Sequence, residues 1–213
     1  MKQKFYSAFW LKHLGVYYML VASFYFALNG ALAKVMAEHM SSAEIVFFRN
    51  VVGIGIVLFS LRRVKTLGPG GKPWLLAFRG FIGSCGILAT FYNIAHIDLG
   101  TAFTFQKTAP IFTALFSAFF LGEKLSSRGW FAILLGFGGI LLVVRPHIGI
   151  SATDAVGIFG GMCAGLAYTS VRELRKHYAT NLIVLVFVSS ATFLSATMMI
   201  TGWVLEGSEV KIL

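Results

Sequence analysis

The chain has 213 residues, of which 57% are hydrophobic and 12% are charged, and its formal net charge at pH 7 is +10. The apolar content excludes a string of soluble domains and indicates one membrane domain. The positive charge does not indicate a nucleic-acid partner, because the basic residues lie at the ends of apolar runs, where anionic lipid headgroups neutralise them.

Seven apolar runs are candidates for transmembrane helices. A bilayer core of about 30 Å is crossed by roughly 20 residues at 1.5 Å each. The expected spans, in chain order, are residues 17–35, 43–61, 74–95, 101–121, 130–144, 156–168 with an extension to about 177, and 182–204. We therefore predict an all-α fold, a polytopic transmembrane helix bundle. The first run is too long for a cleavable signal and lacks a small-residue cleavage site, so we expect it to stay in the membrane.

Lysine and arginine alternate between the two sides of these spans. Twelve of the 18 basic residues fall in the N-terminus and in the second, fourth and sixth loops. Short loops rich in Lys and Arg stay on the cytoplasmic side, so we expect a cytoplasmic N-terminus. Arg49, Arg79 and Lys107 are basic residues inside the spans.

The chain contains a weak internal echo. Residues 27–47 can be aligned with residues 167–187, and both segments run from a helix end through a polar stretch into an apolar run. The two segments are five helices apart, and a unit with an odd number of helices inserts its second copy upside down. Inverted repeats of this kind are common in secondary transporters.

The fourth and fifth spans carry the most specific motif. The chain resembles the EamA-type branch of the drug/metabolite transporter superfamily over nearly its whole length. The residues that carry the resemblance are 99–102, Pro110, 114–125 and 136–140, with Ser42, Glu44, 47–50, Arg79, Gly80, Tyr92 and Asn93 in the second and third spans. The resemblance implies ten helices in two inverted halves of five. We expect residues 1–148 to form the first five-helix repeat and residues 149–213 two helices of the second, which makes the chain a fragment or a truncated product.

Lys107 is the most costly residue to place in a membrane, and charged residues inside spans tend to be functional. One interpretation is that it lines a central cavity and attracts an anionic or zwitterionic substrate; the alternative is that it extends to the outer headgroups. Arg49 either contacts substrate or pairs with a polar group such as Glu44. For Arg79, near the other end of its span, extension to the headgroups is the leading interpretation.

Polar residues recur at helical spacing on the first and fourth spans. Tyr25 and Asn29 share a stripe that either lines a cavity or bonds a neighbouring helix. Gln106 and Pro110 share a stripe with Thr113 and Ser117. Because proline removes a backbone hydrogen bond, we expect a kink at a gate.

Two further groups complete the candidate residues. Tyr92, Asn93 and Tyr168 either contact substrate or serve as interfacial residues. The sixth span carries a stripe of small residues that favours close helix packing and suits sliding between helices. That stripe consists of Gly157, Gly161 and Gly165.

These features favour a secondary transporter that moves a small polar or amphipathic metabolite, such as an amino acid or a related compound, by alternating access. An in-span carboxylate is absent near mid-membrane, which favours a facilitated carrier or an exchanger. The alternatives are a non-transporting product that needs a partner chain or forms a homodimer, and an intramembrane lipid-modifying enzyme, for which the sequence lacks convergent catalytic groups. A receptor with seven spans requires an external N-terminus. We expect no cofactor and no metal, and a bacterial inner membrane as the location.

Overall fold

The computed structural model describes residues 14–62, 68–122, 125–144 and 151–209. Over these residues the chain forms helices and no strands, which confirms the predicted all-α bundle. The helices are α2 (Leu14–Met36), α3 (Ser42–Leu61), α4 (Pro73–His96), α5 (Leu99–Gln106), α6 (Ala109–Leu121), α7 (Ser127–Val144), α8 (Ala152–Leu174) and α9 (Thr180–Glu209). Of the described helices, four are long and apolar enough to cross a membrane: α2, α3, α4 and α9 over Thr180–Gly202.

Several helix ends are fixed by local hydrogen bonds that the sequence supplies. Ser41 and Glu44 form a capping box at the start of α3, and Ser151 and Asp154 form one at the start of α8. The Glu44 carboxylate accepts from the Ser41 amide at 2.8 Å, so it stabilises the helix end and is not aimed at Arg49. Gly122 ends α6 in the left-handed conformation, with φ of 68°.

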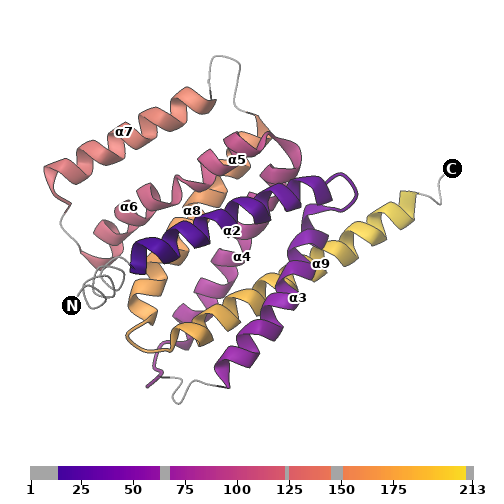
Figure 1. The fold of residues 1–213 in the computed structure, drawn as a ribbon, viewed down its shortest axis with the longest axis horizontal. Coiled ribbons are helices and arrows are strands. Elements are labelled where there is room, and N and C mark those ends of the chain that lie inside the picture. Colours follow the sequence, from indigo (N-terminus) through magenta and orange to yellow (C-terminus); the bar gives the residue numbers. More distant parts are fainter. Residues whose placement is uncertain (1–13, 63–67, 123–124, 145–150, 210–213) are drawn as a thin grey trace, which may run out of the picture.

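The helices form a bundle with α4 and α8 at its centre (Figure 1). The most extensive contacts join α4 to α8 and α3 to α9, and α6 packs on α8 from the other flank. Helix α7 lies at the edge of the bundle and contacts α5 and α6, while α2 runs across α4 and α5. Segments from the two expected repeats are therefore paired with each other.

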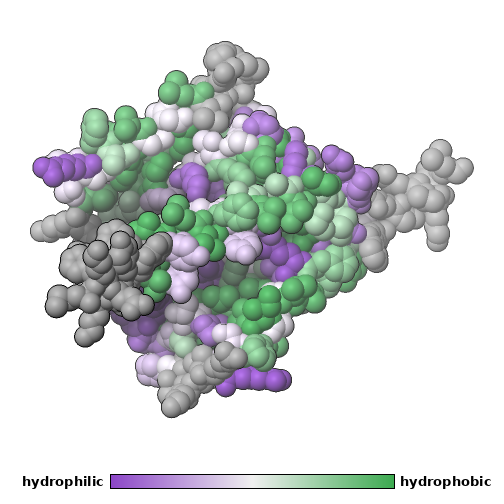
Figure 2. Space-filling view, viewed as in Figure 1, coloured by the Kyte–Doolittle hydropathy of each residue, from purple (hydrophilic) through white to green (hydrophobic). Residues whose placement is uncertain are grey.

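Hydrophobic residues cover much of the face shown in Figure 2, interspersed with smaller hydrophilic patches. Large hydrophobic side chains are exposed on several helices, including Met19 on α2, Phe119 on α6, Leu142 on α7 and Phe193 on α9. A soluble protein rarely exposes apolar surface of this extent, whereas lipid covers it at no cost. Together with the long apolar helices, this surface identifies an integral, multi-pass membrane protein.

A buried apolar cluster packs the four helices α2, α3, α4 and α5 together at one end of the bundle. Its members are Ala33, Ile45, Val46, Leu88, Phe91, Ile94 and Ala102. Beside it, the Lys34 ammonium donates to the carbonyls of Ala95 and Ile97 at 3.1 and 2.8 Å. A cation at the carboxyl end of a helix satisfies unpaired carbonyls and favours the helix dipole, so Lys34 fixes the end of α4 against α2.

The expected fourth span is not one continuous helix. It is divided into α5 and α6 by Lys107 and Thr108. Pro110 has no N–H to donate to the Gln106 carbonyl. The Ile111 amide donates to the carbonyl of Thr108, three residues earlier, at 2.9 Å. The Thr108 hydroxyl donates to the Phe105 carbonyl at 2.6 Å. The expected span over residues 101–121 is thus interrupted just before Pro110, the residue at which the sequence indicated a kink, and hydropathy alone does not register this change in hydrogen bonding.

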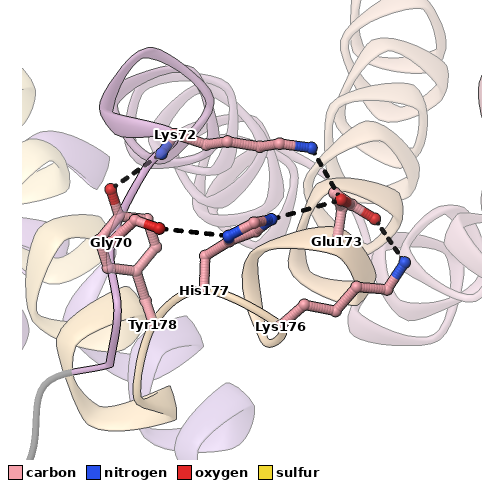
Figure 3. Close-up of polar contacts among 6 residues, drawn as sticks. All are labelled: Gly70, Lys72, Glu173, Lys176, His177 and Tyr178. Atoms are coloured by element: carbon pink, nitrogen blue, oxygen red, sulfur yellow. Dashed lines mark hydrogen bonds and ion pairs between the residues drawn. The ribbon is translucent and has the colours of Figure 1, made fainter.

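At the opposite end from the apolar cluster, two loops are joined by polar contacts, which we call the Glu173 cluster (Figure 3). Its members are Gly70, Lys72, Glu173, Lys176, His177 and Tyr178. The Glu173 carboxylate accepts from Lys176 at 2.7 Å and from Lys72 at 2.8 Å, and the Gly70 amide donates to the His177 carbonyl at 2.9 Å. We refer to this end of the bundle, which carries the Lys- and Arg-rich loops, as the basic side.

The loop before α4 depends on glycine for this docking. Gly68, Gly70 and Gly71 have φ of 96°, 75° and 114°. At Gly68 a Cβ atom would collide with the backbone at His177, so both the conformation and the contact exclude a side chain there. These glycines allow residues 68–72 to dock onto the end of α8.

We expect the Glu173→Gln substitution to loosen residues 68–72 from α8. The hydrogen bonds from Lys176 and Lys72 lower the pKa of Glu173 from 4.5 to about 2. Because the folded pKa is depressed, the stabilisation is present above pH 4.5 and is lost as the pH falls towards 2. Amide hydrogen exchange at Gly70 should be several-fold faster in the variant at pH 7. Glu38→Gln, on the opposite side, is the control, and unchanged exchange at Gly70 would contradict this role for Glu173.

Candidate functional site

The break between α5 and α6 is pressed against the glycine stripe of α8. A Cβ atom at Gly157 would collide with the Phe105 ring, one at Gly161 with the Thr108 hydroxyl, and one at Gly165 with Phe112. Phe105 and Thr108 are buried at this contact. The three glycines therefore allow α8 to approach the α5–α6 break closely.

A cavity of about 450 Å³ lies between α6 and α8, and we call it the α6–α8 cavity. Its size is within the range of small-molecule sites. It is lined by Pro110, Thr113, Ala114, Ser117, Leu125, Tyr168 and Arg172. Three members of the stripe that the sequence indicated on the fourth span, Pro110, Thr113 and Ser117, thus line a cavity together with Tyr168 on α8, whereas Gln106 is not among its lining residues.

Arg172 supplies the positive charge of this cavity. Its guanidinium donates to the Ser117 hydroxyl at 3.3 Å, and Tyr168 lies one helical turn before it on α8. The Thr113 hydroxyl donates to the Ala109 carbonyl at 2.7 Å, within α6. A guanidinium beside a phenol and a hydroxyl is suited to a carboxylate-bearing ligand.

Lys107 lies directly at the helix break, next to Gln106 of the stripe and outside the residues that line the α6–α8 cavity. Its side chain is exposed, and the ammonium lies 5.8 Å from the centre of the Phe26 ring on α2. Lys107 and Ser117 are ten positions apart, which corresponds to about 15 Å along a helix. Arg172 is therefore a cation in the α6–α8 cavity, and Lys107 is a second cation at the helix break, outside the cavity lining.

The structure distributes the other predicted residues over several surfaces. Tyr25 and Asn29 are exposed on α2, beside the Phe26 that contacts Lys107. Tyr92 stacks on His96 with ring centres 4.0 Å apart, and the Arg49 guanidinium lies 5.3 Å from the Phe91 ring. These contacts leave Arg49 and Tyr92 outside the α6–α8 cavity.

Buried polar atoms mark a second set of residues. The side-chain oxygens of Asn93 and Gln106 are buried and accept no hydrogen bond from the described residues, and two guanidinium nitrogens of Arg79 are buried and donate none to them. Asn93 lies against Gly157, next to Phe105. The Arg79 guanidinium lies 4.7 Å from the Phe187 ring on α9, so these atoms are held within the bundle and do not extend to the headgroups. Such atoms are expected to find a partner in water or a ligand.

Arg172 was not among the sequence candidates, because it was counted as a loop charge. The signal that identifies it is its spacing from Tyr168, which places both side chains on one face of α8. Among the described residues, no group of three His, Cys, Asp or Glu side chains is placed to hold a metal ion.

Comparison with known proteins gives a consistent result. The EamA-like transporter family matches residues 13–145. A Helicobacter pylori protein named "Uncharacterized transporter" is 33% identical over 84% of this chain and 62% of its own length, and the pseudopaline exporter CntI of Pseudomonas aeruginosa is 33% identical over 91% of this chain and 69% of its own length. An S-adenosylmethionine uptake transporter of Rickettsia bellii is 24% identical over 63% of this chain and 46% of its own length. The chain thus spans about two thirds or less of these relatives. No solved structure matches it.

We expect Gly161→Ala to destabilise the bundle, because the added methyl group would collide with the buried Thr108 hydroxyl. Overpacking of this kind costs about 1–3 kcal/mol in free energy of unfolding. Thermal unfolding of the purified protein in detergent measures the effect. Gly55→Ala is the matched control, since a Cβ atom on α3 at Gly55 would meet no atom within 4 Å. Equal melting temperatures for the two variants would contradict close packing at Gly161.

Proposed function

Because the chain belongs to the EamA-like transporter family, we propose that it is part of a secondary transporter that moves a small metabolite bearing at least one carboxylate, such as an amino acid or a related compound. The observation that carries the substrate class is the Arg172 guanidinium of α8 in the α6–α8 cavity, beside the Ser117 hydroxyl, with a second cation, Lys107, exposed at the helix break. Cations at a cavity raise the local concentration of anionic substrate groups. The family and the named relatives favour transport over catalysis.

The broken helix supports an alternating-access mechanism. In secondary transporters the substrate site commonly lies at a discontinuous helix between repeats. Here the break at Lys107 and Thr108 lies between α2 and α8, which belong to different expected repeats. We propose that Pro110 allows α6 to bend relative to α5, and that the glycine stripe of α8 is the surface against which this movement occurs.

The orientation and the energy source follow from charge. We propose that the basic side faces the cytoplasm of a bacterial cell, across the inner membrane. Glu44, the acidic residue nearest to mid-membrane among the described helices α2 to α6, is used in the cap of α3. A facilitated carrier or an exchanger therefore suits this chain better than a proton antiporter. The exposed stripe on α2 would be enclosed by one of three partners: further helices outside the 213 residues, a different chain, or a second copy of this chain.

The test is transport of a panel of metabolites by the purified chain in proteoliposomes, with amino acids first and uncharged analogues of the same size as comparison. We expect Lys107→Ala and Arg172→Gln each to reduce flux of carboxylates roughly ten-fold, because each removes a charged hydrogen-bond donor. Arg62→Gln is the control on the basic side, outside the α6–α8 cavity.

Two results would contradict the proposal. If the flux of carboxylates were unchanged in both variants, Lys107 and Arg172 would have no role in the substrate pathway. Flux that is absent from a correctly inserted parent chain, and stays absent when the remaining third of a relative is supplied in trans, would contradict the transporter function itself.

A further inference from the structure

A second cavity, of about 500 Å³, lies on another face of α8, and we call it the basic-side cavity. It is formed by α4, α6 and α8 where these helices reach the basic side. Its lining residues are Lys72, Leu75, Phe78, Phe120, Leu166, Thr169, Ser170, Glu173 and Lys176. None of these residues lines the α6–α8 cavity, so the two spaces are distinct.

The inner wall of the basic-side cavity is suited to hydrocarbon. Leu75, Phe78, Phe120 and Leu166 supply apolar surface, and Phe120 is 69% exposed. The hydroxyls of Thr169 and Ser170 donate to carbonyls one turn earlier on α8, at 2.9 and 2.8 Å. Their donors are therefore used within the helix, and the wall favours an acyl chain over a strongly polar solute.

The mouth of the cavity carries a net positive charge. Lys72 and Lys176 share the carboxylate of Glu173, which is the one acid among the described lining residues. The two lysine side chains are 44% and 67% exposed. Each ammonium has three N–H donors and uses one on Glu173, so both can donate to a further anion at the membrane surface.

We propose that the basic-side cavity binds an anionic phospholipid, with one acyl chain against Phe78, Phe120 and Leu166 and the headgroup phosphate on Lys72 and Lys176. Basic pockets between helices at a membrane surface favour anionic headgroups, and each lysine near the surface contributes about 1 kcal/mol. The lipid would bridge α4, α6 and α8 at the point where the Glu173 cluster joins two loops. This site is separate from the proposed substrate pathway.

The experiment measures lipid retained by the purified chain in native mass spectrometry. The probes are palmitoyl-oleoyl phosphatidylglycerol, its phosphatidylcholine counterpart and glycerol 3-phosphate. We expect preferential binding of phosphatidylglycerol, which Lys72→Gln and Lys176→Gln each weaken about five-fold. Lys72→Arg and Lys176→Arg keep the charge and should retain the binding, even where the glutamine variants disturb the loops.

Arg128→Gln is the matched control, since it removes one basic charge from α7, outside the cavity lining. If Arg128→Gln weakened phosphatidylglycerol binding as much as the lysine variants do, the preference would come from general surface charge, and the proposed site would be overturned. Loss of binding in the arginine variants, equal retention of phosphatidylcholine, or displacement of the lipid by glycerol 3-phosphate at a similar concentration would each overturn it as well. The last result would identify a soluble organic anion as the occupant.

Discussion

The close approach of α8 to the broken helix is the contact on which the rest of the structure depends. Glycines at positions 157, 161 and 165 leave room for Phe105, Thr108 and Phe112. A side chain at any of these positions would separate α8 from α5 and α6. The Thr108 hydroxyl, buried at this contact, donates to the Phe105 carbonyl at the break. Backbone that leaves the helical pattern inside a membrane is tolerated only where protein or a cavity surrounds it, and α8 provides that protein surface.

Helix α8 also packs closely on α4, through a different face. A Cβ atom at Gly86 would lie 3.3 Å from the Ala164 amide nitrogen, and one at Gly160 would lie 3.0 Å from Ala89. Small residues on two faces make α8 the central helix, in contact with both α4 and the broken helix. Its polar residues near the basic side then divide between two cavities, with Arg172 in one and Glu173 in the other. One helix thus separates the α6–α8 cavity from the basic-side cavity.

The sequence predicts the helices well and their interruptions less well. Apolar length identifies α2, α3, α4 and α9, because a continuous hydrophobic run has one low-energy conformation in lipid. It does not locate the break at Lys107, since the apolar runs on both sides of Gln106, Lys107 and Thr108 are together long enough to be counted as one span. Pro110 indicates a disturbance nearby, but the turn that separates α5 from α6 lies before it, where Thr108 bonds to Phe105.

The candidate residues divide in a similar way. Helical spacing brought Pro110, Thr113 and Ser117 to one cavity, because residues at that spacing share a helix face whatever the fold. The partners of Arg49 and Arg79 are aromatic rings on other helices, Phe91 and Phe187. Spacing along one helix carries no information about such contacts. Arg172 was missed since charge counting assigns a residue to a side of the membrane and not to a cavity.

The pairing of α4 with α8 has a consequence for how the chain is made. Helix α4 leaves the ribosome more than fifty residues before α8, so its small-residue surface around Gly83 and Gly86 enters the bilayer without a partner. Helix α3 is in the same position with respect to α9. The contacts of α4 with α8 and of α3 with α9, which are the most extensive of the bundle, can therefore form only after the late helices have been synthesised.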